Sequence, residues 1–122
     1  MTIEKTLIDY LISQNIDDVN GEVYPMTPKQ PLPDNYIVID KTGSRTENGI
    51  PTATIAIQSI SSESLLKAIQ INDAVKNAMK GFPQIENVFG VHLQTDYNFT
   101  NSLTKQYRYQ AVFSVTYIDL GG

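Results

Sequence analysis

The sequence predicts an α+β fold in one domain, residues 1–122, with a mainly antiparallel sheet and two helices packed on one face. Two segments carry apolar residues at helical spacing, and several others alternate between apolar and polar residues as strands do. They follow the order helix, strands, helix, strand hairpin. With 122 residues, 41% of them hydrophobic and 18% charged, the chain has the composition of a soluble domain with one core.

The first helix is expected over residues 2–14. Thr2 is a suitable N-cap, and Glu4 lies in the first turn, where the helix dipole favours an acid. The sequence NIDDVNG, residues 15–21, breaks the helical pattern, and Val23 and Tyr24 after it are expected to form a short strand. The apolar residues on one side of the helix are Ile3, Leu7, Ile8 and Leu11.

The stretch VYPMTPKQPLPDNYIVID, residues 23–40, contains four of the six prolines within nine positions. Each proline fixes φ, removes a backbone donor and favours extended geometry in the residue before it. We therefore expect an extended arm, followed by a strand over residues 36–40. Two interpretations of the arm are open: a semi-rigid connector along the surface of its own domain, or a ligand for a proline-recognising domain. The four prolines are Pro25, Pro28, Pro31 and Pro33.

The sequence KTGSRTENGI, residues 41–50, contains two glycines and the turn signal Asn48-Gly49, with no large apolar residue before Ile50. These features predict a long, exposed hairpin connection that is mobile in the free subunit. A strand is expected to follow over residues 52–60, because its apolar and polar residues alternate.

A second helix is expected over residues 62–80, with Ser61 as its N-cap and Gly81 as its C-terminal stop. Lys76 and Lys80 lie in its last turn. The apolar stripe that should pack on the sheet consists of Leu65, Ala68, Ile69, Val75 and Met79.

Two long strands are expected over residues 85–97 and 107–117, joined by a polar, turn-rich connection over residues 98–106. In the first strand, His92, Gln94 and Asp96 should lie opposite the face that carries Phe89, Val91, Leu93 and Tyr97. In the second, one face carries Tyr107, Tyr109, Ala111, Phe113, Val115 and Tyr117. The other face of the sheet is semi-polar, which suits either water or a non-obligate protein interface; it carries Gln94, Gln110, Ser114, Thr116, Val112 and Ile118.

No active site is visible in the sequence. Cysteine is absent, His92 is the single histidine, and the adjacent Asp17 and Asp18 are better placed for a turn or cap than for acid-base chemistry. The glycine-containing loop at residues 41–50 does not match a phosphate-binding motif. We therefore predict no catalytic, cofactor-binding or metal-binding residues, and a protein that is not an enzyme.

The net charge of −4 is concentrated in the first half of the chain, where residues 1–60 hold eight acids and four bases. Because no basic patch is present, tight binding of nucleic acid is disfavoured. The N-terminal sequence MTIEKTLIDYLISQ has no basic region followed by an apolar stretch and a cleavage site, and no apolar run is long enough to span a bilayer. We therefore expect a protein of the cytosol, without membrane contact.

The order of these elements resembles that of the tail terminator and tail-completion (head-tail joining) proteins of long-tailed bacteriophages and prophages. The resemblance spans nearly the whole chain: the N-terminal helix, then VYPMTPKQPLPDNYIVID, a glycine-containing loop, ATIAIQSISSESLLKAIQINDAVKNAM and a final hairpin. It lies in the arrangement of elements and a few short patterns, because the family has no catalytic signature.

This resemblance implies a ring of identical subunits, commonly six, that caps the tail tube, ends its polymerisation and joins the tail to the head. The implied partners are further copies of the chain, the tail tube protein and the head or neck connector proteins, with DNA passing through the ring without sequence-specific binding. The protein would lie at the tail-neck junction of the virion, and in the host cytoplasm during assembly. No cofactor is implied.

We expect the subunit interfaces to involve Lys41, Arg45 and Glu47 in the glycine-containing loop, and Tyr24 and Pro25 in the proline arm. Two alternatives remain open: another head-tail connector or head-completion protein, or a small ligand-binding α+β domain that uses the polar sheet face as its pocket.

Overall fold

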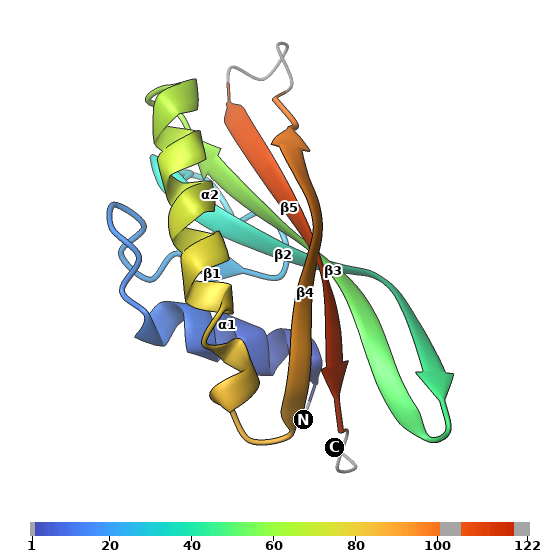
Figure 1. Cartoon of the computed structure of the whole chain (residues 1–122). Helices are drawn as coiled ribbons and strands as arrows, with labels where there is room; N and C mark the ends of the chain where they lie inside the picture. The colour runs from blue at the N-terminus through green and yellow to red at the C-terminus, as the bar shows by residue number, and fades with distance from the viewer. Residues whose placement is uncertain (1, 101–105, 119–122) are drawn as a thin grey trace.

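The computed structural model describes residues 2–100 and 106–118, and this part of the chain forms a five-stranded sheet with two α-helices on one of its faces (Figure 1). The predicted α+β class is therefore confirmed. Along the chain the elements are α1 (Ile3–Ser13), β1 (Val23–Tyr24), β2 (Asn35–Glu47), β3 (Ile50–Ser61), α2 (Leu65–Met79), the short 3-10 helix η1 (Phe82–Gln84), β4 (Val88–Asn98) and β5 (Tyr107–Tyr117).

The strands lie in the order β1-β2-β3-β5-β4. The last strand of the chain, β5, therefore pairs with β3, and β4 forms one edge of the sheet. All neighbouring pairs are antiparallel except β1 and β2, which run parallel through Val23 opposite Ile37 and Tyr24 opposite Val38. Because β1 is so short, it covers only the first part of β2. Residues 101–105 of the predicted connection between the last two strands lie outside the described residues.

The main core lies between the helices and the inner face of the sheet. Isoleucines of β2 and β3 and the aromatic ring of Phe113 on β5 pack against the apolar sides of both helices. The Tyr10 hydroxyl of α1 donates to the Ala78 carbonyl oxygen of α2 at 2.6 Å, and its ring lies 5.1 Å from that of Phe82. Burial raises the pKa of Tyr10. These contacts fix the two helices relative to each other.

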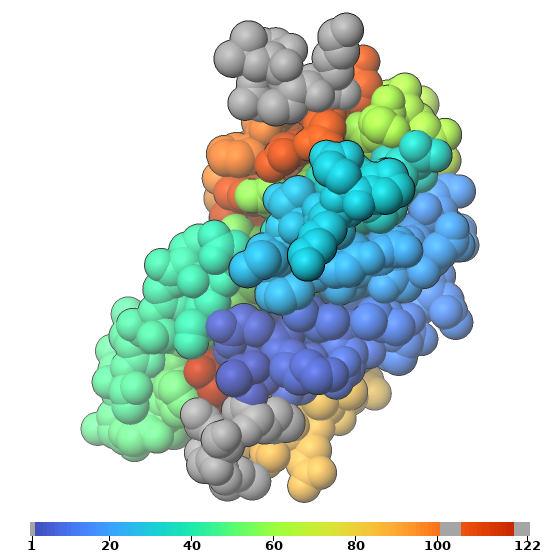
Figure 2. Space-filling view, turned by 180° about the vertical axis from the view of Figure 1, so that it is seen from behind, coloured from blue at the N-terminus to red at the C-terminus, as the bar shows by residue number. Residues whose placement is uncertain are grey.

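A second, smaller apolar cluster lies on the opposite face, where Tyr36, Val38 and Ile60 are buried. Tyr24 and Leu32, from the two ends of the proline arm, pack against this cluster. The arm has no helix or strand, as its prolines predict, and forms the surface above α1 in Figure 2, in light blue to cyan. It therefore contacts its own domain, as a connector would.

The second helix begins three residues later than predicted. Ser64 is the N-cap and accepts a hydrogen bond from the Lys67 amide at 3.0 Å. Ser61 instead ends β3, where it is paired with Asn35 and Tyr107, and its hydroxyl accepts a bond from the Glu63 amide. The prediction of Ser61 as N-cap was wrong because the sheet continues through this residue. For α1 the predicted cap is confirmed, since the Thr2 hydroxyl accepts from the Lys5 amide at 3.2 Å.

The long loop predicted over residues 41–50 is not present. Residues 41–47 continue β2 and residues 50–51 begin β3, so that only Asn48 and Gly49 form the turn. Both turn residues have positive φ, 51° and 79°, as two-residue hairpin turns require. The prediction failed because both faces of this hairpin are exposed, so its sequence shows no alternation. The hairpin projects past the body of the domain (Figures 1 and 2).

The predicted faces of β4 are correct only in part. The strand begins at Val88 instead of residue 85, and its register shifts near Phe89 and again between Leu93 and Thr95. After the second shift Asp96 lies opposite Ala111 on the helix side, while Tyr97 lies opposite Gln110 on the other side. The simple alternation that placed Asp96 beside His92 is therefore wrong, because an extra residue at a bulge exchanges the two faces.

The turn at Gly49 gives a direct test of the hairpin. We expect Gly49→Val to lower the free energy of unfolding by about 1 kcal/mol, because a β-branched residue is strained at a φ of +79°. Urea unfolding followed by circular dichroism measures this. Gly43→Val, in the same hairpin, is the matched control, because an added side chain there has open space and no positive φ. Equal losses for both variants would contradict the turn.

Candidate protein-protein interface

A cluster of metal-ligating side chains is not found among the described residues. Among them no group of three histidine, aspartate or glutamate side chains is close enough to hold a metal ion. His92 lies opposite Ser114 in the sheet, away from the helices. None of the helices that the structure describes combines the length and apolar character needed to cross a membrane. The β2–β3 hairpin, the proline arm and the edges of the sheet are accessible to another protein.

The β2–β3 hairpin carries three of the predicted interface residues, but they do not form one patch. Lys41 lies on the helix side, with its Nζ 4.0 Å from a carboxylate oxygen of Glu4. Arg45 lies opposite Thr52 on the other face, where it lines a groove of about 250 Å³ with polar side chains of β2, β3, β4 and β5. Glu47 lies at the tip, opposite Ile50. The hairpin thus presents different chemistry on each side.

The two predicted interface residues of the arm also separate. Tyr24 is half-buried against the smaller apolar cluster. Pro25 is exposed and lines a groove of about 350 Å³ together with Lys41 and the first residues of α1. The structure therefore brings Pro25 and Lys41 together, while Tyr24 packs within its own domain.

A network of amides and hydroxyls crosses the sheet face away from the helices. An Arg108 guanidinium nitrogen donates to the Gln58 amide oxygen at 3.3 Å, and the Gln58 amide nitrogen donates to Gln110 at 3.1 Å. Gln110 in turn donates to the hydroxyl of Tyr97 on β4. These bonds link side chains of three strands into a polar network that contains the Arg108 cation, although the Arg108 Nε is buried without a hydrogen-bond partner among the described residues.

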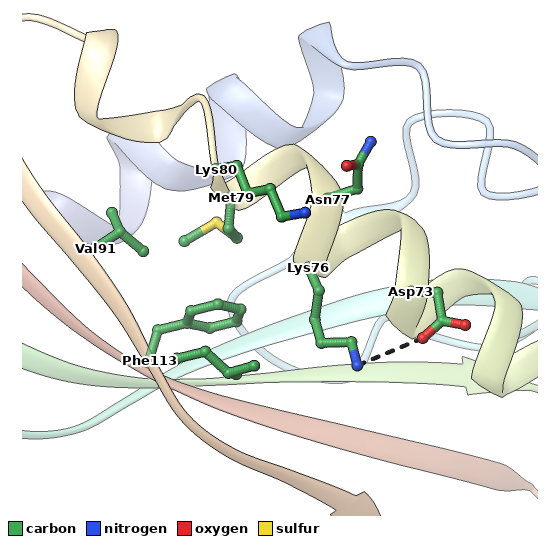
Figure 3. Close-up of a pocket in the computed structure, with 8 residues that line it drawn as sticks. Asp73, Lys76, Asn77, Met79, Lys80, Val91 and Phe113 are labelled. Carbon is green, nitrogen blue, oxygen red and sulfur yellow. Dashed lines mark ion pairs between the residues drawn. The ribbon is translucent and has the colours of Figure 1, made fainter.

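A groove that the sequence did not predict lies between the C-terminal half of α2 and strand β4, with a volume of about 490 Å³ (Figure 3). We call it the α2–β4 groove. Its floor is apolar and its rim is charged. The floor is formed by Met79, Val91, Leu93 and Phe113, and the rim by Asp73, Lys76, Asn77 and Lys80.

The charges on the rim of the α2–β4 groove are unevenly paired. The Lys76 Nζ lies 2.7 Å from Asp96 Oδ2 and 3.5 Å from Asp73 Oδ1. The hydrogen bond from Lys76 lowers the pKa of Asp96, with a further bond from Asn72 at 3.0 Å, and the same bond to Asp96 raises the pKa of Lys76. No carboxylate of the described residues lies within ion-pair distance of Lys80.

Two edges of the sheet also lack a partner strand within residues 2–100 and 106–118. β1 pairs with β2 only as far as Val38, which leaves the outer edge of β2 without a neighbour from Lys41 to Glu47. β4 forms the other edge of the sheet along its whole length. Unpaired edges of this kind are templates for association with another chain.

The sequence matches no protein-family model and no curated protein. Its fold is similar to that of a chain in a structure of the virion of a native gene transfer agent (GTA) particle. The two chains superpose with a TM-score of 0.63 at 16% sequence identity, and the match covers 96% of this chain and 85% of the other. At this identity the likeness shows a shared fold.

The ion pair between Lys76 and Asp96 predicts a pH-dependent stability. Because the pKa of Asp96 is lowered in the folded state, its contribution is complete above its ordinary value of 3.8 and is lost as the pH falls through the lowered value. We expect Asp96→Asn to lower the free energy of unfolding by about 1 kcal/mol at pH 7. The difference in the free energy of unfolding between this variant and the wild type should vanish in strong acid.

Denaturant titrations at a series of pH values measure this difference. Asp73→Asn is the matched control, because Asp73 pairs with the same lysine at the longer distance and its side chain is 66% exposed. We expect that variant to change stability by less than about 0.5 kcal/mol. A loss for Asp96→Asn that is equally large in strong acid and at neutral pH would exclude an electrostatic cause.

Proposed function

We propose that this chain is a non-enzymatic structural protein of a phage or phage-like virion, and that it acts as a tail terminator. In this role several copies form a ring on the end of the tail tube, stop its polymerisation and join the tail to the head or neck. The observation that carries the proposal is the similarity, over 96% of the chain, to the fold of a chain in a gene transfer agent virion.

The surfaces of the domain support a role in assembly. The projecting β2–β3 hairpin includes one unpaired sheet edge, and the α2–β4 groove lies beside the other, so the two surfaces lie on different parts of the molecule. Surfaces that differ in this way form heterologous contacts, in which one patch meets another patch on the next copy. Such contacts close into a ring when the rotation between copies allows it. Six copies are proposed, as in the family that the sequence resembles.

The charge of the chain suits a ring through which DNA passes. The net charge is −4, with the excess of acids in residues 1–60. Negative charge near a lumen repels the DNA backbone and therefore limits adhesion during transfer. We propose that DNA passes without sequence-specific binding, and that the protein contacts the tail tube protein on one side and connector proteins of the neck on the other.

The interface residues proposed from the sequence fit this role to different degrees. Arg45 and Glu47 lie on the projecting hairpin, where a neighbouring molecule can reach them. Lys41 and Pro25 share a groove at the base of the hairpin. Tyr24 is half-buried in its own domain, so its proposed contribution is to hold the arm in place.

Mass measurements in solution and electron microscopy test the proposed function. We expect sedimentation over a range of protein concentrations to show assembly from the 13.6 kDa chain to a ring of about six copies. Mixed with tail tubes, the protein should appear at the tube ends. Tubes without added protein are the control. Binding along the whole tube, or a chain that stays monomeric at every concentration and ignores tail tubes, would contradict a terminator.

A further inference from the structure

The tip of the β2–β3 hairpin and the α2–β4 groove have complementary chemistry. We propose that the hairpin tip of one copy docks in the α2–β4 groove of the next copy, with Ile50 on the apolar floor and Glu47 paired with Lys80. This inference rests on the proposed function, because it names the contact that would hold the ring together.

The groove has the properties of a docking site for an apolar side chain. Leu93 on its floor remains 39% exposed, and Met79, Val91 and Phe113 line the same groove (Figure 3). The volume of about 490 Å³ is sufficient for a branched aliphatic side chain together with part of the adjacent backbone. An apolar floor within a charged rim is the usual composition of a protein interface that forms and dissociates.

The hairpin tip supplies such a side chain at low entropic cost. Ile50 is 46% exposed and is followed by Pro51, which limits the motion of the backbone. The turn before it is held by Asn48 and Gly49, and the strands on either side are paired. Because the tip is already ordered, docking loses less conformational entropy than the ordering of a mobile loop.

The charges favour this pairing of surfaces. Glu47 lies opposite Ile50 in the hairpin, so the carboxylate and the apolar side chain reach a partner together. No cation of the described residues lies within ion-pair distance of Glu47, and Lys80 on the groove rim likewise has no carboxylate there. An acid beside the entering side chain and a cation beside the floor are complementary.

The occupant of the groove is a second copy of the chain. The hairpin projects away from α2, so the tip cannot reach the groove of its own molecule (Figure 1). Each copy therefore offers one tip and one groove, which makes the contact heterologous and allows a closed ring.

Disulfide trapping tests the contact, because the chain contains no cysteine. The variants Ile50→Cys and Leu93→Cys are mixed under assembly conditions and oxidised gently. We expect a disulfide-linked pair in this mixture. Ile50→Cys mixed with Gln14→Cys is the matched control, since Gln14 is exposed at the end of α1 and does not line the groove. Equal trapping in both mixtures would overturn the inference.

Charge reversal gives an independent test. We expect Glu47→Lys and Lys80→Glu each to weaken self-association roughly tenfold, and the double variant to recover most of that loss. The measurement is sedimentation at several concentrations. If rings cap tail tubes, but no disulfide forms between Ile50→Cys and Leu93→Cys and the double charge variant does not recover association, this inference is wrong. The proposed function then remains intact. A chain that never associates would overturn both.

Discussion

The helices cover only part of one face of the sheet, and most of the accessible surfaces follow from this constraint. α1 and α2 pack over β1, β2, β3 and β5, where the isoleucines and Phe113 form the main core. The helices do not cover the β2–β3 hairpin. The α2–β4 groove lies between α2 and the edge strand β4. A protein that acts by assembly needs surfaces of this kind, while the buried core keeps them in fixed positions.

The bulges of β4 determine which side chains of this edge strand lie on the helix side of the sheet. Without the register shift after Leu93, Asp96 would lie on the same face as His92, and no carboxylate from this part of the strand would reach Lys76. With the shift, Asp96 pairs with Lys76 at 2.7 Å, which anchors α2 to the edge strand. Among the residues that the structure describes, no carboxylate pairs with Lys80 on the groove rim. Bulges at the edges of sheets often re-aim a side chain in this way.

Much of the fold could be predicted from the sequence because the buried elements carry strong periods. The stripe of α1 and the alternation of Ala111, Phe113 and Val115 follow from one-sided burial. In α2 the predicted stripe was right at three positions, Ala68, Val75 and Met79. It was wrong at Leu65 and Ile69, which are only half-buried, and it missed the buried Ile71. The hairpin over residues 41–50 has two exposed faces, so no period marks it, and its strands follow from backbone pairing alone. The α2–β4 groove is formed by residues from α2, β4 and β5, and its existence depends on how these elements pack, which composition does not reveal. The roles of Lys41, Arg45, Glu47, Tyr24 and Pro25 in an interface remain predictions.

Self-association through the surfaces that the helices leave uncovered is the central claim, and hydrogen exchange of the free and the assembled protein tests it most directly. If it is correct, assembly slows exchange in the hairpin from Lys41 to Glu47 and along β4, while the exposed side of α1 exchanges as before. If exchange slows only in α1 and the proline arm, with the hairpin and β4 unchanged, the claim is wrong.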